Sequence, residues 1–323
     1  MRVSDHQRLL VKIAKLYYEQ EETQSQISKR LRLSRQKVQR LLKEARQEGI
    51  VQLSIRPLMG VFDDLERKLE DNFGLREVIV IEIKDYHDHK EVTREIGAAA
   101  AEFLLRILQE NDLLTISWGS SLLGMVDSLH ASMSRVEIDG IKVVQGLGGL
   151  GDPTNETHAA ELTRRFASVL GGQAALLPAP GIVGSPAVGE AFKTDPHVQN
   201  ALRMAASANL AFMGIGAPRK DSILIQQGNI VDWQELKLLK AQGAVGDINL
   251  RYFDHHGRSI DSDLNSRVIG LTLDEIRRIN TVVGIAGGEA KYDAILGAVN
   301  GHLIDVLVTD HITAQNLLDD SIN

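Results

Sequence analysis

The chain has 323 residues, of which 43% are hydrophobic and 24% are charged, a composition typical of globular proteins with more than one domain. It contains no cysteine, which excludes disulfides, thiol catalysis and metal centres held by cysteine. The N-terminus is charged, and no apolar run reaches the ~18 residues of a membrane-spanning helix. We therefore expect a soluble cytoplasmic protein with no membrane partner.

Charge is distributed unevenly along the chain. The formal net charge is −7, but residues 1–56 contain 13 Lys and Arg against 6 Asp and Glu. The rest of the chain is therefore acidic. A basic N-terminal segment on an acidic body indicates that only this segment meets a polyanion, although a solvated basic surface has the same composition.

Three helices are predicted in the basic segment. Apolar residues at helical spacing predict the first over residues 5–19. Thr23 is the predicted N-cap of the second, TQSQISKRLRL, and Ser34 of the third, SRQKVQRLLKEARQEG. The short turn 32–34 between the last two gives helix-turn-helix spacing. The following segment IVQLSIR (50–56) alternates apolar and polar residues, which predicts the strand of a small wing.

The third helix carries the side chains that a recognition helix needs. Long hydrogen-bonding side chains at its N-terminal end suit base edges in the major groove of double-stranded operator DNA. Arg matches guanine and Gln matches adenine, whereas Ser and Lys suit phosphates. The predicted DNA-contacting residues are Gln24, Gln26, Ser34, Arg35, Gln36, Lys37, Gln39 and Arg40. A solvated helical face rich in Arg and Gln is the alternative interpretation.

A linker follows the basic segment. The stretch RPLMG (56–60) breaks the pattern, and VFDDLERKLEDNFGL then predicts a helix with one apolar side. That side consists of Phe62, Leu65, Leu69 and Phe73. It suits either the pairing of two subunits or packing on the chain's own body. The predicted boundaries are 1–56 for the helix-turn-helix domain, 57–76 for the linker helix and 77–323 for the body.

The body alternates strand-like and helix-like segments. The predicted strands are 77–83, 113–117, 141–145, 174–179, 210–216, 281–287 and 305–310, with helical patterns between them such as 91–108, 157–170 and 290–299. This alternation predicts a doubly wound α/β domain with a mostly parallel sheet. Ligands of such sheets bind in the loops at the carboxyl ends of the strands.

Several of these strand-end loops carry polar groups. SWGSSLLGM, after strand 113–117, places Ser120 and Ser121 at the start of a helix, where backbone N–H groups attract anions. Ordinary N-capping by serine is the alternative. Other polar side chains in strand-end loops are Asn155, Arg219, Asp247, Arg251 and Lys291. Together they suit a phosphorylated, polyhydroxylated small molecule.

The stretch VVQGLGGLGDP contains the G-x-G-x-x-G spacing of dinucleotide-binding loops. Its context argues against that ligand, because Asp152 and Pro153 delay the helix and the next predicted strand ends without an acidic residue. We therefore expect no cofactor. G-x-S-x-G and H-E-x-x-H do not occur, and the His/Asp runs are typical of polar turns, so no metal is expected.

The chain resembles the SorC family of bacterial sugar-responsive transcriptional regulators over nearly its full length. TQSQISKRLRLSRQKVQRLLKEARQEGIVQLSI is similar to that family's helix-turn-helix, and SWGSS, VVQGLGG, GAVGDINLRYFDHHG, VVGIAGGEAKYDAI and VLVTDHITAQNLL match its recurring blocks in order. The resemblance implies a large domain similar to sugar-phosphate isomerases of the ribose-5-phosphate and glucosamine-6-phosphate type. This domain would bind the effector and form homodimers or homotetramers.

The resemblance also implies roles for individual residues. Those expected to bind the effector are Gly119, Ser120 and Ser121 at its phosphate, Gln145, Gly146 and Asn155 along the sugar, Asp247 and Lys291 on the other side, and Arg219. Ser117 stands where the family's first loop often begins with Gly, before the contact atoms. The glycine-rich loop offers Leu147 and no Arg, which argues against a bisphosphate effector.

The resulting prediction is a DNA-binding transcriptional regulator controlled by a sugar or sugar phosphate, without enzymatic activity. The alternative is an active sugar-phosphate isomerase with a DNA-binding appendage. That enzyme would use Asp247 or Glu289 as general base and Lys291 as electrostatic partner.

Overall fold

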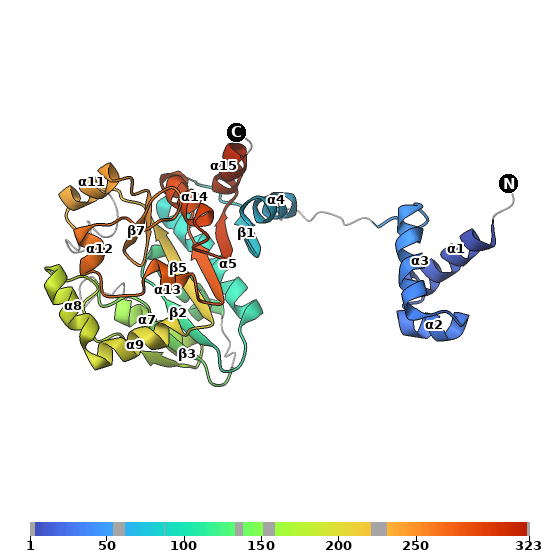
Figure 1. Cartoon of the computed structure of the whole chain (residues 1–323), viewed down its shortest axis with the longest axis horizontal. Helices are drawn as coiled ribbons and strands as arrows, with labels where there is room; N and C mark the ends of the chain where they lie inside the picture. Colours follow the sequence, from blue (N-terminus) through green and yellow to red (C-terminus); the bar gives the residue numbers. More distant parts are fainter. Residues whose placement is uncertain are drawn as a thin grey trace. The chain divides into compact units, whose positions relative to one another are not determined.

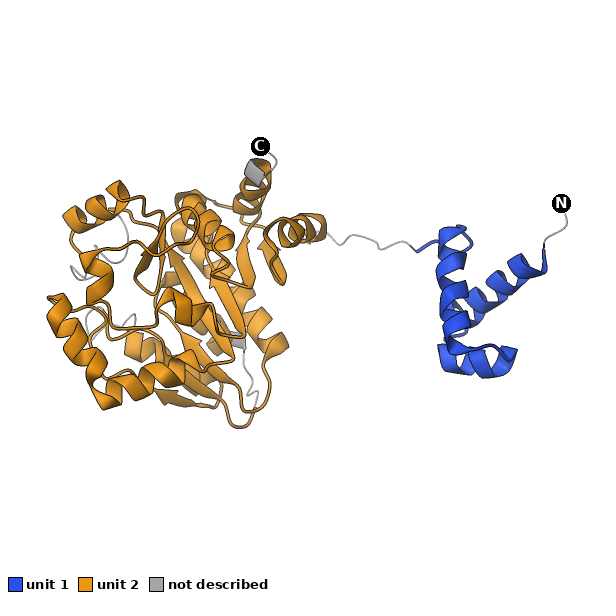
Figure 2. Cartoon of the chain, in the orientation of Figure 1, with its two compact units in different colours: residues 1–58 blue, residues 59–323 orange. Residues whose placement is uncertain are grey.

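The computed structural model describes residues 4–53, 62–86, 88–132, 138–150, 159–220 and 231–321. The chain divides into two compact units, residues 1–58 and residues 59–323 (Figure 2). Each unit has hydrophobic clusters of its own. No helix in the described ranges is long and apolar enough to cross a membrane.

The described part of the N-terminal unit is helical, with α1 (Asp5–Tyr18), α2 (Gln24–Leu31) and α3 (Arg35–Gln47). The predicted N-caps are confirmed: the Thr23 side chain accepts from the Gln26 N–H, and that of Ser34 from the Lys37 N–H. The buried core of the unit consists of Leu10, Ile13, Ala14, Leu16, Ile27, Val38, Leu41, Leu42 and Ala45. The three helices are therefore held together by the apolar faces that the periodicity predicts.

The predicted wing is not confirmed. Residues 50–53 form no strand, and residues 54–56 of the same segment lie outside the described residues. The Val51 N–H donates to the Ala45 carbonyl (3.1 Å), so the chain folds back on the end of α3 instead of extending. An alternating pattern of seven residues does not make a strand by itself, because a strand needs a pairing partner.

The strands of the larger unit form a parallel sheet in the order β1-β9-β8-β5-β2-β3-β4. Strands β1, β2, β3 and β5 of this sheet are labelled in Figure 1. The strand bounds are β1 (Glu77–Ile81), β2 (Leu113–Ile116), β3 (Lys142–Gln145), β4 (Gln173–Ala175), β5 (Leu210–Gly216), β8 (Thr281–Ile285) and β9 (Val306–Asp310). Each overlaps one predicted strand, which confirms the α/β class. A short hairpin, β6 (Gly246–Ile248) and β7 (Arg251–Phe253), pairs antiparallel with the end of β5 and is not predicted by the sequence.

Helices cover both faces of this sheet. One hydrophobic cluster joins it to α5 (His89–Ile107), α6 (Ser120–Ser132) and α7 (Ala159–Val169). The cluster on the other face includes residues of α4 (Asp63–Phe73), α9 (Pro196–Ala206), α13 (Leu273–Ile276), α14 (Tyr292–Asn300) and α15 (His311–Ser321). Successive strand residues alternate between the two clusters, as Val282 and Val283 of β8 do. The remaining helical segments are α8 (Pro186–Thr194), α11 (Trp233–Ala241), α12 (Asp263–Arg267) and the 3-10 turn η1 (Glu289–Lys291).

Helix α4, the predicted linker helix, packs on the α/β unit. Leu69 is fully buried in the cluster on that face, and Phe62, Leu65 and Phe73 pack against the same cluster. Two of its carboxylates also pair with strand β1: the Val80 N–H donates to Glu66 (2.9 Å) and the Val78 N–H to Glu70 (2.9 Å). Of the two roles open to the apolar stripe, packing on the chain's own body is the one observed. The carboxylates satisfy amides of a strand at the edge of the sheet.

Candidate effector site and DNA-contacting surface

The candidate effector residues lie at the carboxyl ends of neighbouring strands. The relevant strands are β8, β5, β2 and β3, which are consecutive in the sheet. Lys291 follows β8, Asp247 lies on the hairpin paired with β5, Ser120 follows β2, and Gly146 follows β3. Parallel strands bring their carboxyl ends to one edge of the sheet, which explains why residues far apart in the sequence meet here.

The loop after β2 leads directly into helix α6. Gly119 has a positive φ of 149°, and Ser120 and Ser121 are the first two residues of the helix. Ser121 is buried, and Ser120 is partly exposed. The first N–H groups of a helix have no acceptor within it, so this turn presents free donors and a positive partial charge to an anion. The Ser117 hydroxyl accepts from the Gly214 N–H (3.1 Å), so it fixes the loop against β5.

The glycine-rich loop after β3 is held closely by its neighbours. A Cβ on Gly146 would lie 2.9 Å from the Thr115 hydroxyl, so only glycine fits without displacement. The buried Gln145 amide is already engaged: its Nε2 donates to the Leu147 carbonyl (2.6 Å), and its Oε1 accepts from the Leu177 N–H (3.2 Å). These bonds favour a role for Gln145 in shaping the loop. Asn155, predicted beyond this loop, lies outside the described residues.

Asp247 is placed by the hairpin β6–β7. The turn residues Asn249 and Leu250 both have positive φ, and the Leu250 N–H donates to the Asp247 carboxylate (3.2 Å). A Cβ on Gly216, the residue opposite Asp247 in strand β5, would lie 2.2 Å from its Oδ1. Glycine at 216 therefore makes room for a carboxylate that is only 7% exposed. Arg219, further along the chain from β5, has an exposed side chain.

Asp247 is buried and Lys291 partly buried, and their opposite charges act on each other. Burial raises the pKa of Asp247 to about 6, although the Leu250 N–H and the charge of Lys291 act in the opposite direction. Burial lowers the pKa of Lys291 to about 8, and the Asp247 charge partly offsets this. Both groups are thus charged near neutral pH. A carboxylate accepts from sugar hydroxyls, and an ammonium group donates to a phosphate or hydroxyl oxygen.

Two further residues lie near the site: Asn249, for which the sequence predicts no role, and Arg251, one of the predicted polar groups of the strand-end loops. Asn249 is 3% exposed, and its Nδ2 donates to the Gly146 carbonyl (2.8 Å), whereas its Oδ1 has no partner among the described residues. Arg251 is also buried, and within the described residues its guanidinium donates to the backbone carbonyls of Asn265, Val268, Gly270 and Leu271. The block GDINLRYF marks this region, but no sequence pattern identifies its contacts with the glycine-rich loop.

The predicted DNA-contacting surface is largely exposed in the N-terminal unit. Exposed residues of the set are Gln26, Ser34, Arg35, Gln36, Lys37, Gln39 and Arg40, and Gln24 is partly exposed. Val38 between them is buried in the core, as its helical position requires. Two predicted contacts also cap helices: the Gln26 side chain accepts from the Thr23 N–H (2.8 Å), and the Ser34 hydroxyl from the Lys37 N–H (3.2 Å).

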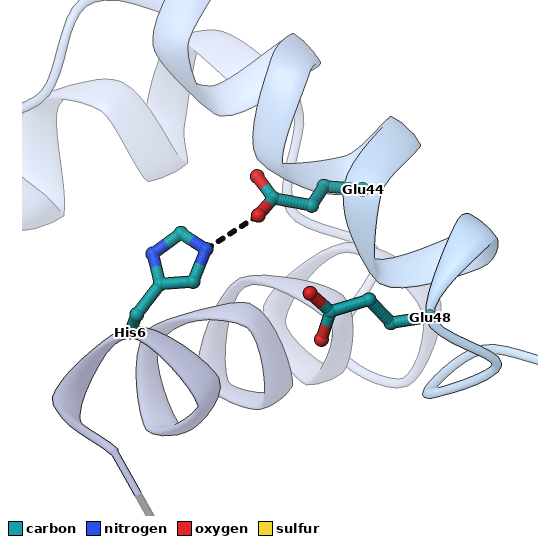
Figure 3. Close-up of side chains that lie close together, drawn as sticks. All are labelled: His6, Glu44 and Glu48. Carbon is teal, nitrogen blue, oxygen red and sulfur yellow. Dashed lines mark hydrogen bonds and ion pairs between the residues drawn. The ribbon is translucent and has the colours of Figure 1, made fainter.

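His6, Glu44 and Glu48 form a cluster between α1 and the C-terminal end of α3 (Figure 3). His6 Nε2 lies 2.5 Å from Glu44 Oε1, and the three potential ligand atoms are within 4.8 Å of one another. The cluster is solvent-exposed, and Glu44 lies nine positions beyond Arg35, roughly 13 Å along the helix. The contact between His6 and Glu44 joins α1 to α3 at a place away from the predicted recognition residues.

A helical DNA-binding unit followed by an α/β unit with polar strand-end loops defines the class of ligand-responsive transcriptional regulators. The sugar-binding domain family matches residues 60–319, and the chain belongs to this family, that of the SorC-type regulators. It is 31% identical to the "Deoxyribonucleoside regulator" of Bacillus subtilis over 98% of this chain and 99% of that protein. It is 30% identical to the "Sorbitol operon regulator" of Klebsiella pneumoniae, covering 98% of this chain and 100% of the relative.

A solved structure shows the same full-length architecture. The crystal structure of the full-length sorbitol operon regulator SorC from Klebsiella pneumoniae has a TM-score of 0.71 and 30% identity, covering 98% of this chain and 100% of that one. This likeness confirms the fold class, an N-terminal helical unit joined to a parallel α/β domain. The relatives are named as regulators of sugar-related operons, which favours regulation over catalysis.

Proposed function

We propose that the chain is a sequence-specific DNA-binding transcriptional regulator, without enzymatic activity, whose operator binding is controlled by a sugar or sugar phosphate. The observation that supports this proposal is the placement of the helix start at Ser120 and Ser121, of Asp247 and of Lys291 at the carboxyl ends of neighbouring strands. The helix start and Lys291 suit a phosphate, and Asp247 suits hydroxyls. Gly119, Gly146, Asn155 and Arg219 complete the proposed effector site, with Gln145 shaping the loop.

Effector and DNA binding would be linked through subunit arrangement. We infer a cytoplasmic homodimer or homotetramer that places two recognition helices one DNA turn, or a multiple of it, apart. An effector that binds one arrangement more tightly shifts the population toward it and changes operator affinity. DNA affinity should fall steeply with salt, because the exposed Arg and Lys side chains release counterions from phosphates.

The effector is tested by thermal denaturation with ribose 5-phosphate, 2-deoxyribose 5-phosphate, glucose 6-phosphate and sorbitol 6-phosphate, each beside the free sugar. A ligand at a hundredfold its Kd stabilises the protein by roughly 2.7 kcal/mol. We expect a response to a phosphorylated compound that is lost in the double variant S120A/S121A. Thr163→Ala, which removes a buried hydroxyl from α7, is the control. An equal response to the free sugar would refute the phosphate cradle.

The recognition helix is tested by operator binding in the full chain. The operator is obtained by selection from a random DNA pool. The double variant R35A/Q36A should lose discrimination between operator and random DNA and keep the thermal response to the effector. Lys12→Ala and Lys15→Ala on α1 serve as matched charge controls. Retained discrimination in R35A/Q36A would show that another surface reads the bases.

A second candidate function, sugar-phosphate isomerisation, is favoured by one observation. Burial raises the pKa of Asp247 to about 6, close to the value that suits a general base at neutral pH. Incubating the pure protein with the same phosphates and following aldose–ketose interconversion tests it. Turnover that disappears in Asp247→Asn would establish catalysis; no turnover under conditions where the effector binds would leave regulation alone.

A further inference from the structure

The loop that carries Lys291 is held by Asp310 and Thr313, two residues where strand β9 leads into helix α15, which we call the clamp. Gly288, in the left-handed region at φ 90°, donates its N–H to Asp310 Oδ2 (2.8 Å) and to Thr313 Oγ1 (3.1 Å). Asp310 and Thr313 also bind each other, through the Thr313 N–H to Oδ1 (2.8 Å) and the hydroxyl to Oδ2 (2.7 Å). Both side chains are at most 1% exposed, so these bonds are shielded from water.

The loop backbone also packs closely against Asp310. A Cβ on Gly287 would lie 2.3 Å from Asp310 Oδ2, so the backbone touches the carboxylate directly. The Lys291 N–H donates to the Gly288 carbonyl (2.9 Å), which carries the constraint to the lysine within one turn. A displacement of Lys291 by a ligand therefore acts on Asp310 and Thr313.

His311, which directly follows Asp310 in the chain, contacts the start of α4. Its ring stacks on Phe62, with centroids 5.6 Å apart and ring planes inclined by 20°. The Phe62 carbonyl accepts from the Leu65 and Glu66 N–H groups (both 2.9 Å), so Phe62 sets where α4 begins. His311 Nδ1 accepts from the Ile83 N–H (3.4 Å), which holds the ring beside the segment after β1.

Helix α4 is the first described element of the α/β unit along the chain from the DNA-binding unit. A surface groove of about 620 Å³ between α4 and α15 is lined by Phe62 and His311 together with Asp63, Lys68 and Gln315, among others. None of the proposed effector residues lines it. Helices α4 and α15 also share a hydrophobic cluster, and the stacked rings are the contact made by the residue directly after Asp310. The groove beside the rings gives this contact space to shift.

We propose that His311 is a positioning residue that couples the Gly287–Lys291 loop to the start of α4, so that a change at the effector site alters the element leading to the DNA-binding unit. The coupling rests on the proposed function for its biological input. The contacts that would transmit the change, from Thr313 through His311 to Phe62, are present without any ligand. The input and the contacts can therefore be tested separately.

The ligand-free test is a double-mutant cycle read by amide hydrogen exchange in the full chain. Thr313→Val removes the hydroxyl from the clamp, and exchange should rise about fivefold at Gly288 and also at Leu65 and Glu66. In the Phe62→Ala background, Thr313→Val should no longer change exchange at α4. Thr163→Val, the same change at a buried helical threonine, is the control. A rise at Gly288 with no change at α4 would overturn the coupling.

The second test separates binding from response. With the phosphate selected by thermal denaturation, His311→Ala should keep the effector Kd within about twofold and lose at least about fivefold of the effector's influence on operator affinity. His197→Ala, at an exposed position of α9, is the control. A His311→Ala protein that binds and responds normally refutes the proposal. If no sugar or phosphate binds the wild type, the proposed function fails, and the exchange cycle alone decides the coupling.

Discussion

Replacing Arg251 by Met should destabilise the α/β unit while leaving the helical unit intact. Arg251 begins strand β7, is 7% exposed and donates to four backbone carbonyls. Those carbonyls belong to Asn265, Val268, Gly270 and Leu271. The same segment pairs with the glycine-rich loop, through the Gly148 N–H to the Ile269 carbonyl (2.9 Å) and the Leu271 N–H to the Gly146 carbonyl (3.0 Å).

Two opposing contributions determine how far Arg251→Met changes the free energy of unfolding. Each hydrogen bond from a charged donor contributes roughly 1.5–3 kcal/mol, so four of them are a large favourable sum. Burying a guanidinium is costly, and burial lowers the pKa of Arg251 to about 10, although the charge of Glu275 acts in the opposite direction. Met avoids that cost and fills a similar volume, but it leaves four carbonyls without their donor. We expect a net loss of roughly 3 kcal/mol in the free energy of unfolding.

Urea denaturation followed by tryptophan fluorescence measures this loss of stability in the α/β unit. The chain has two tryptophans, Trp118 and Trp233, and both lie in the α/β unit. Arg251→Lys should fall between wild type and Arg251→Met, because one ammonium group cannot reach four carbonyls. Arg258→Met, at an exposed arginine in the loop after β7, should change stability little. An Arg251→Met protein within about 1 kcal/mol of wild type would refute the argument.

Three further predictions concern the N-cap of α2, Gly216 and Lys291. Thr23→Ala removes the N-cap of α2 and should lower the stability of the helical unit by about 1 kcal/mol, seen by circular dichroism; Thr272→Ala, a cap in the other unit, should not. Gly216→Ala should displace the Asp247 carboxylate, weakening effector binding and costing about 1–3 kcal/mol in urea. Because the lowered pKa of Lys291 is about 8, affinity for a phosphorylated effector should fall as pH rises from 7 to 9. In Lys291→Met that pH dependence should disappear; its persistence would assign it to another group.

Short-range features were accurately predicted because their physics is local. The N-caps Thr23 and Ser34 each accept from the N–H group three residues away, so the residues themselves identify the start of each helix. The sheet strands are recognisable because a parallel sheet buried on both faces requires apolar runs. The wing is not confirmed, and the reason is the opposite one: a strand depends on a pairing partner that the segment IVQLSIR does not specify.

The linker helix shows an intermediate case. Its apolar stripe predicts that one side is buried, and the structure confirms that Leu69 is buried completely. The apolar pattern does not predict which surface covers this side of the helix, because a second subunit and the chain's own sheet can both offer an apolar surface. The structure shows that the stripe packs on the chain's own sheet, where Glu66 and Glu70 also accept from the edge strand β1.

The amino-acid sequence by itself determined the two-part organisation, the parallel α/β class and the candidate residues in the strand-end loops. Only the tertiary structure showed how those loops are held. Asn249 bonds to Gly146 across 103 residues, and Gly288 to Asp310 across 22. Such contacts depend on which strands become neighbours in the sheet, and local patterns of hydrophobicity and capping do not contain that order.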